Sequence, residues 1–238
     1  MKNKKSFIIG AIALVILGGG FFLIRSSKKQ VTEETTAKIP HIETIDSEKL
    51  PYLRLTPKEN NHKLLLSILD AKGFEKVEYE LIYELEDGLT RGATGDMNLT
   101  EKNQKEILLG TCSSGKCKYD EGVTGGELII NLQKDDKLYS FQTKFVLLQK
   151  GDNFTSDDEK ITITAQNSFC LLIGGGLPAE TEKEVVNGPY ILSNISENSQ
   201  AELENINGNL LVWQEKEKIW QAISSPEILS ENTYLLVK

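Results

Sequence analysis

The chain has 238 residues and a net charge of −8, but its charges are unevenly distributed. Residues 1–29 carry six cations and no acid, so the remainder of the chain carries −14. A region this acidic repels nucleic acid and anionic lipid headgroups, which excludes both from the expected partners. Three cysteines and two histidines also limit metal and nucleophile chemistry, and we expect no metal and no cofactor.

Residues 7–24, FIIGAIALVILGGGFFLI, contain no charge and predict a transmembrane helix. Eighteen residues of helix rise about 27 Å, just enough to cross a hydrocarbon core. Lysines precede the run, as in signal anchors, and no A-x-A cleavage site comes after it. We therefore expect an uncleaved anchor, with a cleaved signal peptide as the alternative. The short segment 1–6 should stay in the cytoplasm, which places the C-terminal region outside it.

Residues 25–61 have the composition of a flexible tether. The run begins with polar residues that show no apolar period, and Pro40, Pro51 and Pro57 interrupt its second half. Such a stretch buries too little apolar surface to fold alone. Alternatively, residues 51–55 of this tether leave it and dock on the folded region as its first edge strand.

From His62 onward the pattern becomes that of β-strands. Residues 62–70 predict a strand, and residues 77–86 alternate apolar side chains with mostly glutamates. A period of two with one apolar face is typical of an antiparallel sheet. Residues 88–104 are interpreted as a polar connection. Further strands are predicted at residues 105–111, 126–133, 137–149 and 160–165. Short strands with regular turn signals favour an immunoglobulin- or fibronectin-like β-sandwich for residues 62–166.

Residues 167–238 predict a smaller C-terminal β-rich domain. Short apolar runs are separated by turn signals such as Asn207-Gly208, which favours hairpins. Trp213 and Trp220 should face each other across a hairpin turned at residues 215–218 and serve as core aromatics. An exposed pair that stacks on carbohydrate is the alternative, and the same segment also has good helical propensity.

Cys112 and Cys117 flank the turn-forming residues Ser113, Ser114 and Gly115. Facing positions in a hairpin bring two Cα atoms within disulfide range, and an extracytoplasmic site would oxidise the pair. We predict a Cys112–Cys117 disulfide that contributes about 2 kcal/mol. Cys170 lies in an apolar run and should be a small buried hydrophobe. A zinc site built from these three cysteines and His62 is a weaker alternative, because no second closely spaced pair exists.

The residues Leu109, Gly110, Thr111 and Cys112 support an alternative function. They resemble the Leu-x-Thr-Cys nucleophile strand of the sortase family. With a single-pass anchor and a β-rich body, the resemblance implies a transpeptidase that uses Cys112 as nucleophile together with His62. The resemblance covers four residues. The chain departs from the family because all three of its arginines precede Cys112, whereas sortases place theirs after the cysteine.

The acidic run near Asp152 contains Asp157, Asp158 and Glu159 and is interpreted as a solvated loop, with a Ca²⁺ site as the alternative. Together these observations predict a single-pass, membrane-anchored extracytoplasmic protein. Its expected role is that of a non-enzymatic binding or envelope-structural module whose partner is an envelope protein or a glycan. The sortase-like transpeptidase is the alternative function.

Overall fold

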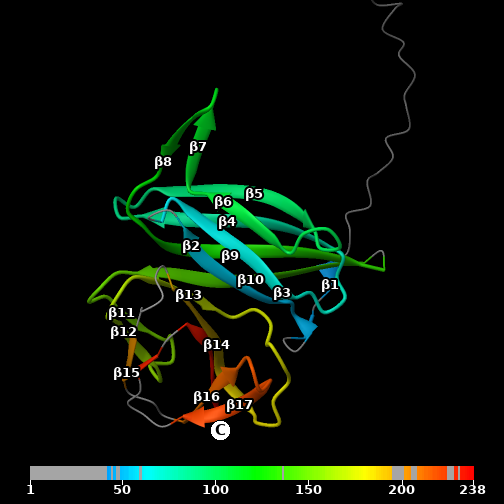
Figure 1. Cartoon of the computed structure of the whole chain (residues 1–238), viewed down its shortest axis with the longest axis vertical. Coiled ribbons are helices and arrows are strands. Elements are labelled where there is room, and N and C mark those ends of the chain that lie inside the picture. The colour runs from blue at the N-terminus through cyan, green and yellow to red at the C-terminus, as the bar shows by residue number, and fades with distance from the viewer. Residues whose placement is uncertain are drawn as a thin grey trace, which may run out of the picture. The chain divides into compact units, whose positions relative to one another are not determined.

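The described part of the chain is built from β-strands, and all but one of their pairings are antiparallel (Figure 1). In this computed structural model the largest sheet has ten strands. Its strands are β1 (Ile42–Glu43), β4 (Lys76–Leu85), β5 (Thr90–Asn98), β9 (Val123–Lys134), β10 (Lys137–Leu148), β13 (Phe169–Ile173), β14 (Val185–Asn194), β16 (Asn209–Gln214), β17 (Ile219–Ile223) and β19 (Asn232–Val237). The order is β17-β16-β19-β14-β13-β10-β9-β4-β5, and β1 pairs in parallel with β10.

Three smaller sheets accompany the large one. A four-stranded sheet contains β11 (Asn153–Thr155), β12 (Thr162–Ala165), β15 (Ala201–Glu204) and β18 (Ile228–Leu229). A three-stranded sheet contains β2 (Tyr52–Lys58), β3 (Lys63–Asp70) and β6 (Gln104–Leu108). A two-stranded hairpin contains β7 (Gly110–Ser113) and β8 (Lys116–Tyr119). The predicted mainly β, antiparallel class is thereby confirmed.

The structure describes residues 42–43, 45–46, 49–58, 61–135, 137–194, 201–204, 208–223, 228–229 and 231–238. The predicted cytoplasmic segment 1–6, the predicted anchor 7–24 and residues 25–41 of the predicted tether lie outside these ranges. Within them, no helix has the length and apolar character needed to cross a bilayer.

The alternating segment predicted at residues 77–86 is β4, and its alternation separates a buried face from a wet one. Val77, Tyr79, Leu81 and Tyr83 are buried, whereas the glutamates between them are exposed. Neighbouring strands β5 and β9 supply the backbone partners of β4 on its two sides. Side chains on a strand point alternately to the two faces of the sheet, so the sequence period determines which face joins the core.

The interpretation of residues 88–104 as a connection is wrong for its central part. Residues 90–98 form β5, which pairs with β4 along nearly its whole length. The strand has no other neighbour in the sheet order, and most of its side chains are exposed. An edge strand with one solvated face needs backbone hydrogen bonds more than apolar side chains, so its polar, glycine-containing sequence gave no strand signal.

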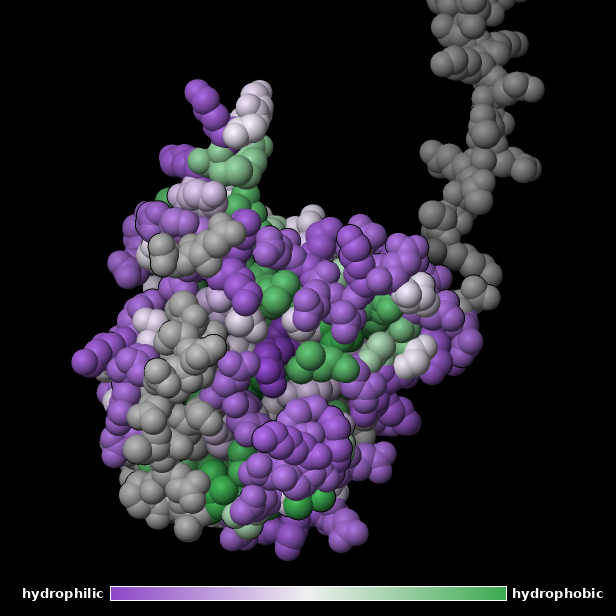
Figure 2. Space-filling model, viewed as in Figure 1, coloured by the Kyte–Doolittle hydropathy of each residue, from purple (hydrophilic) through white to green (hydrophobic). Residues whose placement is uncertain are grey.

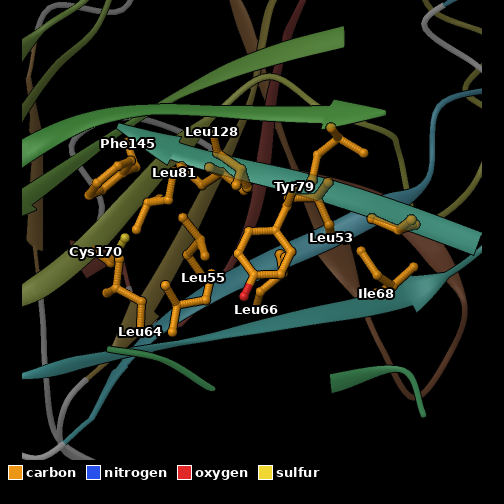
Figure 3. Packing of buried hydrophobic residues seen from close by; sticks show 14 of the residues in the cluster. Leu53, Leu55, Leu64, Leu66, Ile68, Tyr79, Leu81, Leu128, Phe145 and Cys170 are labelled. Atoms are coloured by element: carbon orange, nitrogen blue, oxygen red, sulfur yellow. The ribbon is translucent and has the colours of Figure 1, made fainter. Parts of the chain in front are cut away.

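The first core lies between the three-stranded sheet and one face of the large sheet (Figure 3). Leu53 and Leu55 of β2 and Leu64 of β3 point toward side chains such as Leu81 and Leu128 of the large sheet. β2 is an edge strand, which confirms the docking alternative for residues 51–55. The part of the predicted tether that forms β2 therefore belongs to the core.

The second core lies on the opposite face of the large sheet, and β13 contributes to both cores. Cys170 and Leu172 pack in the first core, whereas Phe169 and Leu171 pack against residues of the four-stranded sheet. The strand pairs with β10 and β14, so it is covered on both faces and both edges. The predicted boundary between residues 166 and 167 falls just before β13, and the large sheet continues across it.

Gly176 allows the segment before β2 to lie against the loop that follows β13. Its N–H donates to the carbonyl of Pro51 at 3.0 Å, and a Cβ atom here would collide with the Leu50 carbonyl. Only a residue without a side chain permits so close a backbone approach. The glycine run at residues 174–176 is therefore a turn with a packing role.

The strands predicted in the last 70 residues are confirmed as β13, β14, β16, β17 and β19. Trp213 and Trp220 are directly opposite each other across the β16–β17 hairpin, with ring centroids 5.4 Å apart and an angle of 61° between the rings. Trp213 is buried and donates its indole N–H to Glu215 at 2.7 Å, and Trp220 donates to the carbonyl of Ala179 at 3.1 Å. Both indoles are used inside the fold, which is the expected behaviour of core aromatics.

Candidate functional site

The hairpin of β7 and β8 is the most distinctive surface feature, and a disulfide closes it. Cys112 and Cys117 are paired directly across the two strands, and their Cα atoms are 4.0 Å apart. The turn residues Ser114 and Gly115 have φ angles of 49° and 78°. Positive φ at both central residues is the mark of the type I′ turn that two-residue hairpins favour. The predicted Cys112–Cys117 disulfide is present.

The base of the hairpin is held by buried groups of the first core. Leu109 is fully buried just before β7, and its carbonyl accepts the N–H of Asp120 at 3.0 Å. Tyr83 of β4 donates its hydroxyl to the Asp120 carboxylate at 2.8 Å. Burial, followed by this contact with Asp120, raises the pKa of Tyr83, so the phenol remains a hydrogen-bond donor at neutral pH. The hairpin therefore leaves the body in one defined direction.

His62 takes part in this anchoring. Its ring stacks on Tyr119 of β8, with centroids 4.2 Å apart and planes 5° apart. Its Nε2 atom lies 3.2 Å from the Glu121 carboxylate. From the sequence, His62 was a candidate only as a catalytic group or a zinc ligand. Contacts between segments this far apart in the chain have no local sequence signal, so the stacking could not be predicted.

The upper part of the hairpin is exposed on both faces. Every residue from 111 to 118 is exposed, and Figure 1 and Figure 2 show the hairpin standing clear of the neighbouring surface. It carries Lys116 and Lys118 and no acid. The tip is thus a small positive element on an acidic body.

The other predicted site residues do not join the hairpin. Cys170 is fully buried in β13, and burial raises the pKa of its thiol, as expected for a structural cysteine. Across the residues that the structure describes, no group of three histidine, cysteine, aspartate or glutamate side chains is placed to hold a metal ion. The described chain therefore offers no support for the zinc alternative.

The acidic loop uses part of its charge to shape its own turns. Asp152 accepts the N–H of Gln149 at 2.8 Å, and Asp158 accepts the hydroxyl of Ser156 at 2.7 Å. Hydrogen bonds from Ser156, Asn187 and Lys160 lower the pKa of Asp158. Carboxylates that cap backbone turns are a common device of loops. These contacts agree with the interpretation of a structured, solvated loop.

Cys112 has no thiolate in this structure, because its sulfur is bonded to that of Cys117. His62 contacts Tyr119 and Glu121 at the base of the hairpin. A cysteine nucleophile requires a free thiolate with a base in reach. In this disulfide-bonded state the hairpin is an exposed protrusion, and Cys112 does not carry the free thiolate that a nucleophile needs.

No protein-family model, no curated protein and no solved structure matches this chain.

Proposed function

We propose that the protein is a non-enzymatic binding module held outside the cytoplasm by a membrane anchor at residues 7–24. The observation that carries this proposal is the exposed hairpin, which is closed by a disulfide at its tip and fixed by buried groups at its base. Rigid protrusions lose little conformational entropy when they bind, which raises affinity for a given contact area. An extracytoplasmic location supplies the oxidising conditions that the disulfide needs.

The partner that this hairpin suits best is a protein of the cell envelope. The tip is narrow and contains small polar side chains together with Lys116 and Lys118, so it fits a surface depression bordered by carboxylates. Apart from Tyr119 at its base, the hairpin contains no tryptophan or tyrosine on which a sugar ring could stack. A glycan partner is therefore the less favoured alternative.

The finer description of the fold belongs to the same proposal. Residues 62–166 would form an immunoglobulin- or fibronectin-like sandwich, and residues 167–238 a smaller β domain joined to it. The support is that two cores occupy opposite faces of the large sheet, each covered by a separate small sheet. Residues 25–41 would then lift this body away from the membrane surface, because β1 at residues 42–43 already pairs with β10.

Site-specific photocrosslinking in intact cells tests the binding role. A photoreactive residue replaces Lys116 at the tip, and a matched control replaces Lys105 on β6, which is also exposed. We expect one adduct of defined mass from position 116 and none from position 105. The adduct should disappear in the Cys112→Ala/Cys117→Ala double variant, because the open hairpin no longer presents one shape.

Two outcomes would contradict the proposal. The first is an adduct pattern that is the same at both positions or insensitive to loss of the disulfide. The second comes from alkylating the full-length protein while its native membrane is dissolved in denaturant, because the folded protein buries Cys170. We expect one modified cysteine before reduction and three after it, whereas three modified cysteines before reduction would show that the disulfide does not form in the cell.

The sortase-like alternative makes the opposite prediction for Cys112. If Cys112 were a nucleophile, Cys112→Ala would abolish activity while Cys117→Ala would spare it. If the disulfide serves only to shape the hairpin, the two single variants should lose partner crosslinking to the same extent. A clear difference between them would favour the transpeptidase.

A further inference from the structure

A hollow of about 370 Å³ lies on the face of the large sheet that carries the second core, opposite the face that carries the first core. Its floor is one row of side chains in register across five neighbouring strands, β4, β9, β10, β13 and β14. This row consists of Ile82, Glu127, Lys144, Ile173 and Tyr190. Residues directly opposite in antiparallel strands share a face, so all five side chains belong to the same surface.

The wall of the hollow comes from β11 and the turn after it. Phe154, Ser156 and Asp157 line this side, and the ring of Phe154 meets Tyr190 edge to face at a centroid distance of 6.3 Å. Gly126 of β9, next to Glu127, also lines the hollow and adds no side chain. A floor on the large sheet and a wall from the four-stranded sheet together make a corner that is lined by both apolar and charged side chains.

The charged groups around the hollow are not balanced within the described chain. Lys144 lies 3.7 Å from Asp157, and both are largely exposed. Glu84 and Glu127 also line the hollow, and neither forms an ion pair with a described residue. Two carboxylates beside an apolar surface favour a ligand that carries a positive charge on an aliphatic chain. The net charge of −14 beyond residue 29 favours such a ligand at longer range.

An independent observation points to the same hollow. Tyr190 is 1% exposed, yet its hydroxyl makes no hydrogen bond of normal geometry to a described residue. The neighbouring Ser156 hydroxyl donates to Asp158 at 2.7 Å and accepts the N–H of Ile161 at 3.1 Å, and no hydrogen bond of normal geometry joins it to Tyr190. Burial raises the pKa of Tyr190 to about 12, so the phenol keeps its proton at neutral pH. A buried donor without an acceptor is costly, and a ligand oxygen would satisfy it.

A second hollow, of about 550 Å³ near Arg54, provides a useful contrast. There Arg54 pairs with Glu231 at 2.7 Å, and Glu215 accepts hydrogen bonds from both Trp213 and Lys218. The charges of those groups are already paired, although the buried Nε atom of Arg54 has no hydrogen bond to a described residue, so that hollow offers a cationic ligand little. The hollow beside Tyr190 differs because its donor and two of its carboxylates are unpaired.

We propose that the hollow beside Tyr190 binds a lysine or arginine side chain of a protein partner. The aliphatic stem would lie on Ile82 and Phe154, and the cationic end would meet Glu84 and Glu127. A backbone carbonyl of the partner would accept the Tyr190 hydroxyl. This contact is separate from the disulfide hairpin, so it goes beyond the binding role assigned to the hairpin.

Nuclear magnetic resonance of isoleucine methyl groups in the full-length protein tests this proposal. The probe is Nα-acetyl-lysine methylamide, and the neutral control is the norleucine equivalent. We expect saturable shifts of Ile82 and Ile173 with the lysine probe, no shift of the remote core residue Ile107, and binding by norleucine that is at least about tenfold weaker.

Variants on β4 and β9 separate the effect of the two carboxylates of the hollow from that of general charge. Glu84→Gln/Glu127→Gln should weaken lysine binding about tenfold, whereas Glu78→Gln/Glu80→Gln, on the same face of β4, should leave it within about twofold. Butylamine tests the role of the carbonyl groups and should bind more weakly than the capped lysine. Equal shifts from lysine and norleucine, or butylamine binding as tightly as the capped lysine, would overturn the proposal. Loss of the hairpin disulfide should not change any of these results.

Discussion

Strand β13 and the β7–β8 hairpin are held in place by opposite means. The four residues from Phe169 to Leu172 are buried, because β13 has a core on each face. The hairpin residues from 111 to 118 are all exposed, and a disulfide and a few anchoring contacts hold them. Burial on both faces secures a strand through apolar packing alone, whereas a strand pair without a core needs a covalent link.

This contrast suggests that β13 determines the stability of the fold, whereas the hairpin determines the partner binding that we propose. Substitutions in β13 should affect two cores at once and lower the stability of the whole fold. Substitutions in the hairpin should alter local shape and partner binding, while the cores remain intact. Variants in each region can therefore test this division.

The largest effect is expected from Leu171→Ala in β13. Leu171 is fully buried in the second core, so the truncation leaves a cavity that its neighbours only partly fill. We expect a loss of about 2–5 kcal/mol in the free energy of unfolding, measured by urea denaturation. The matched control is Leu69→Ala, because Leu69 is 43% exposed, and it should cost less than about 1 kcal/mol. Equal losses at both positions would show that β13 is not the central strand of the fold.

Tyr190 should make the protein sensitive to alkali. Burial raises the pKa of Tyr190 to about 12 in the folded state, above its ordinary value of 10. The contribution of the un-ionised Tyr190 phenol to the free energy of unfolding is complete below pH 10. It is lost as the pH rises, because the phenol ionises at a lower pH in the unfolded chain than in the folded one. The loss should reach on the order of 2 kcal/mol by pH 12. Tyr190→Phe should lack this component, so identical pH profiles for the two proteins would contradict the burial argument.

Opening the disulfide should have a smaller and more local effect. Cys112→Ala/Cys117→Ala removes a link across only a few residues, which we expect to cost at most about 2 kcal/mol. Hydrogen exchange should become faster at residues 111–118 and remain unchanged in β4 and β13. Faster exchange throughout the core would mean that the hairpin supports the fold as a whole.

The Tyr83→Phe variant tests the anchor at the base of the hairpin. It removes the hydrogen bond to Asp120 and should cost about 1 kcal/mol, with little change in the packing of the ring. Because the anchor sets the direction of the hairpin, crosslinking from position 116 should also fall. Unchanged crosslinking with lowered stability would show that the disulfide alone defines the binding shape.

Sequence periodicity predicted strands that have an apolar face and missed the polar strand β5, whereas the exposed β7–β8 hairpin was predicted from its turn residues. β4 and β13 were recognisable because one alternates and the other is continuously apolar. β5 was missed because an edge strand can be almost wholly polar. The disulfide could be predicted from its local spacing, whereas the hollow beside Tyr190 could not. Its floor comes from five strands between residues 76 and 194, and their register is a property of the folded sheet.

The smallest effect on stability should come from the hairpin lysines, and it should coincide with a large effect on binding. Lys116 and Lys118 are exposed and have no core contacts, so Lys116→Glu/Lys118→Glu should change the free energy of unfolding by less than about 0.5 kcal/mol. A partner surface bordered by carboxylates would be repelled by the reversed charge, and adduct formation from a photoreactive residue at position 113 should fall about tenfold or more. Lys105→Glu on β6 is the matched control and should change neither quantity. Retained crosslinking in the reversed-charge hairpin would show that the partner recognises the shape of the tip and not its charge.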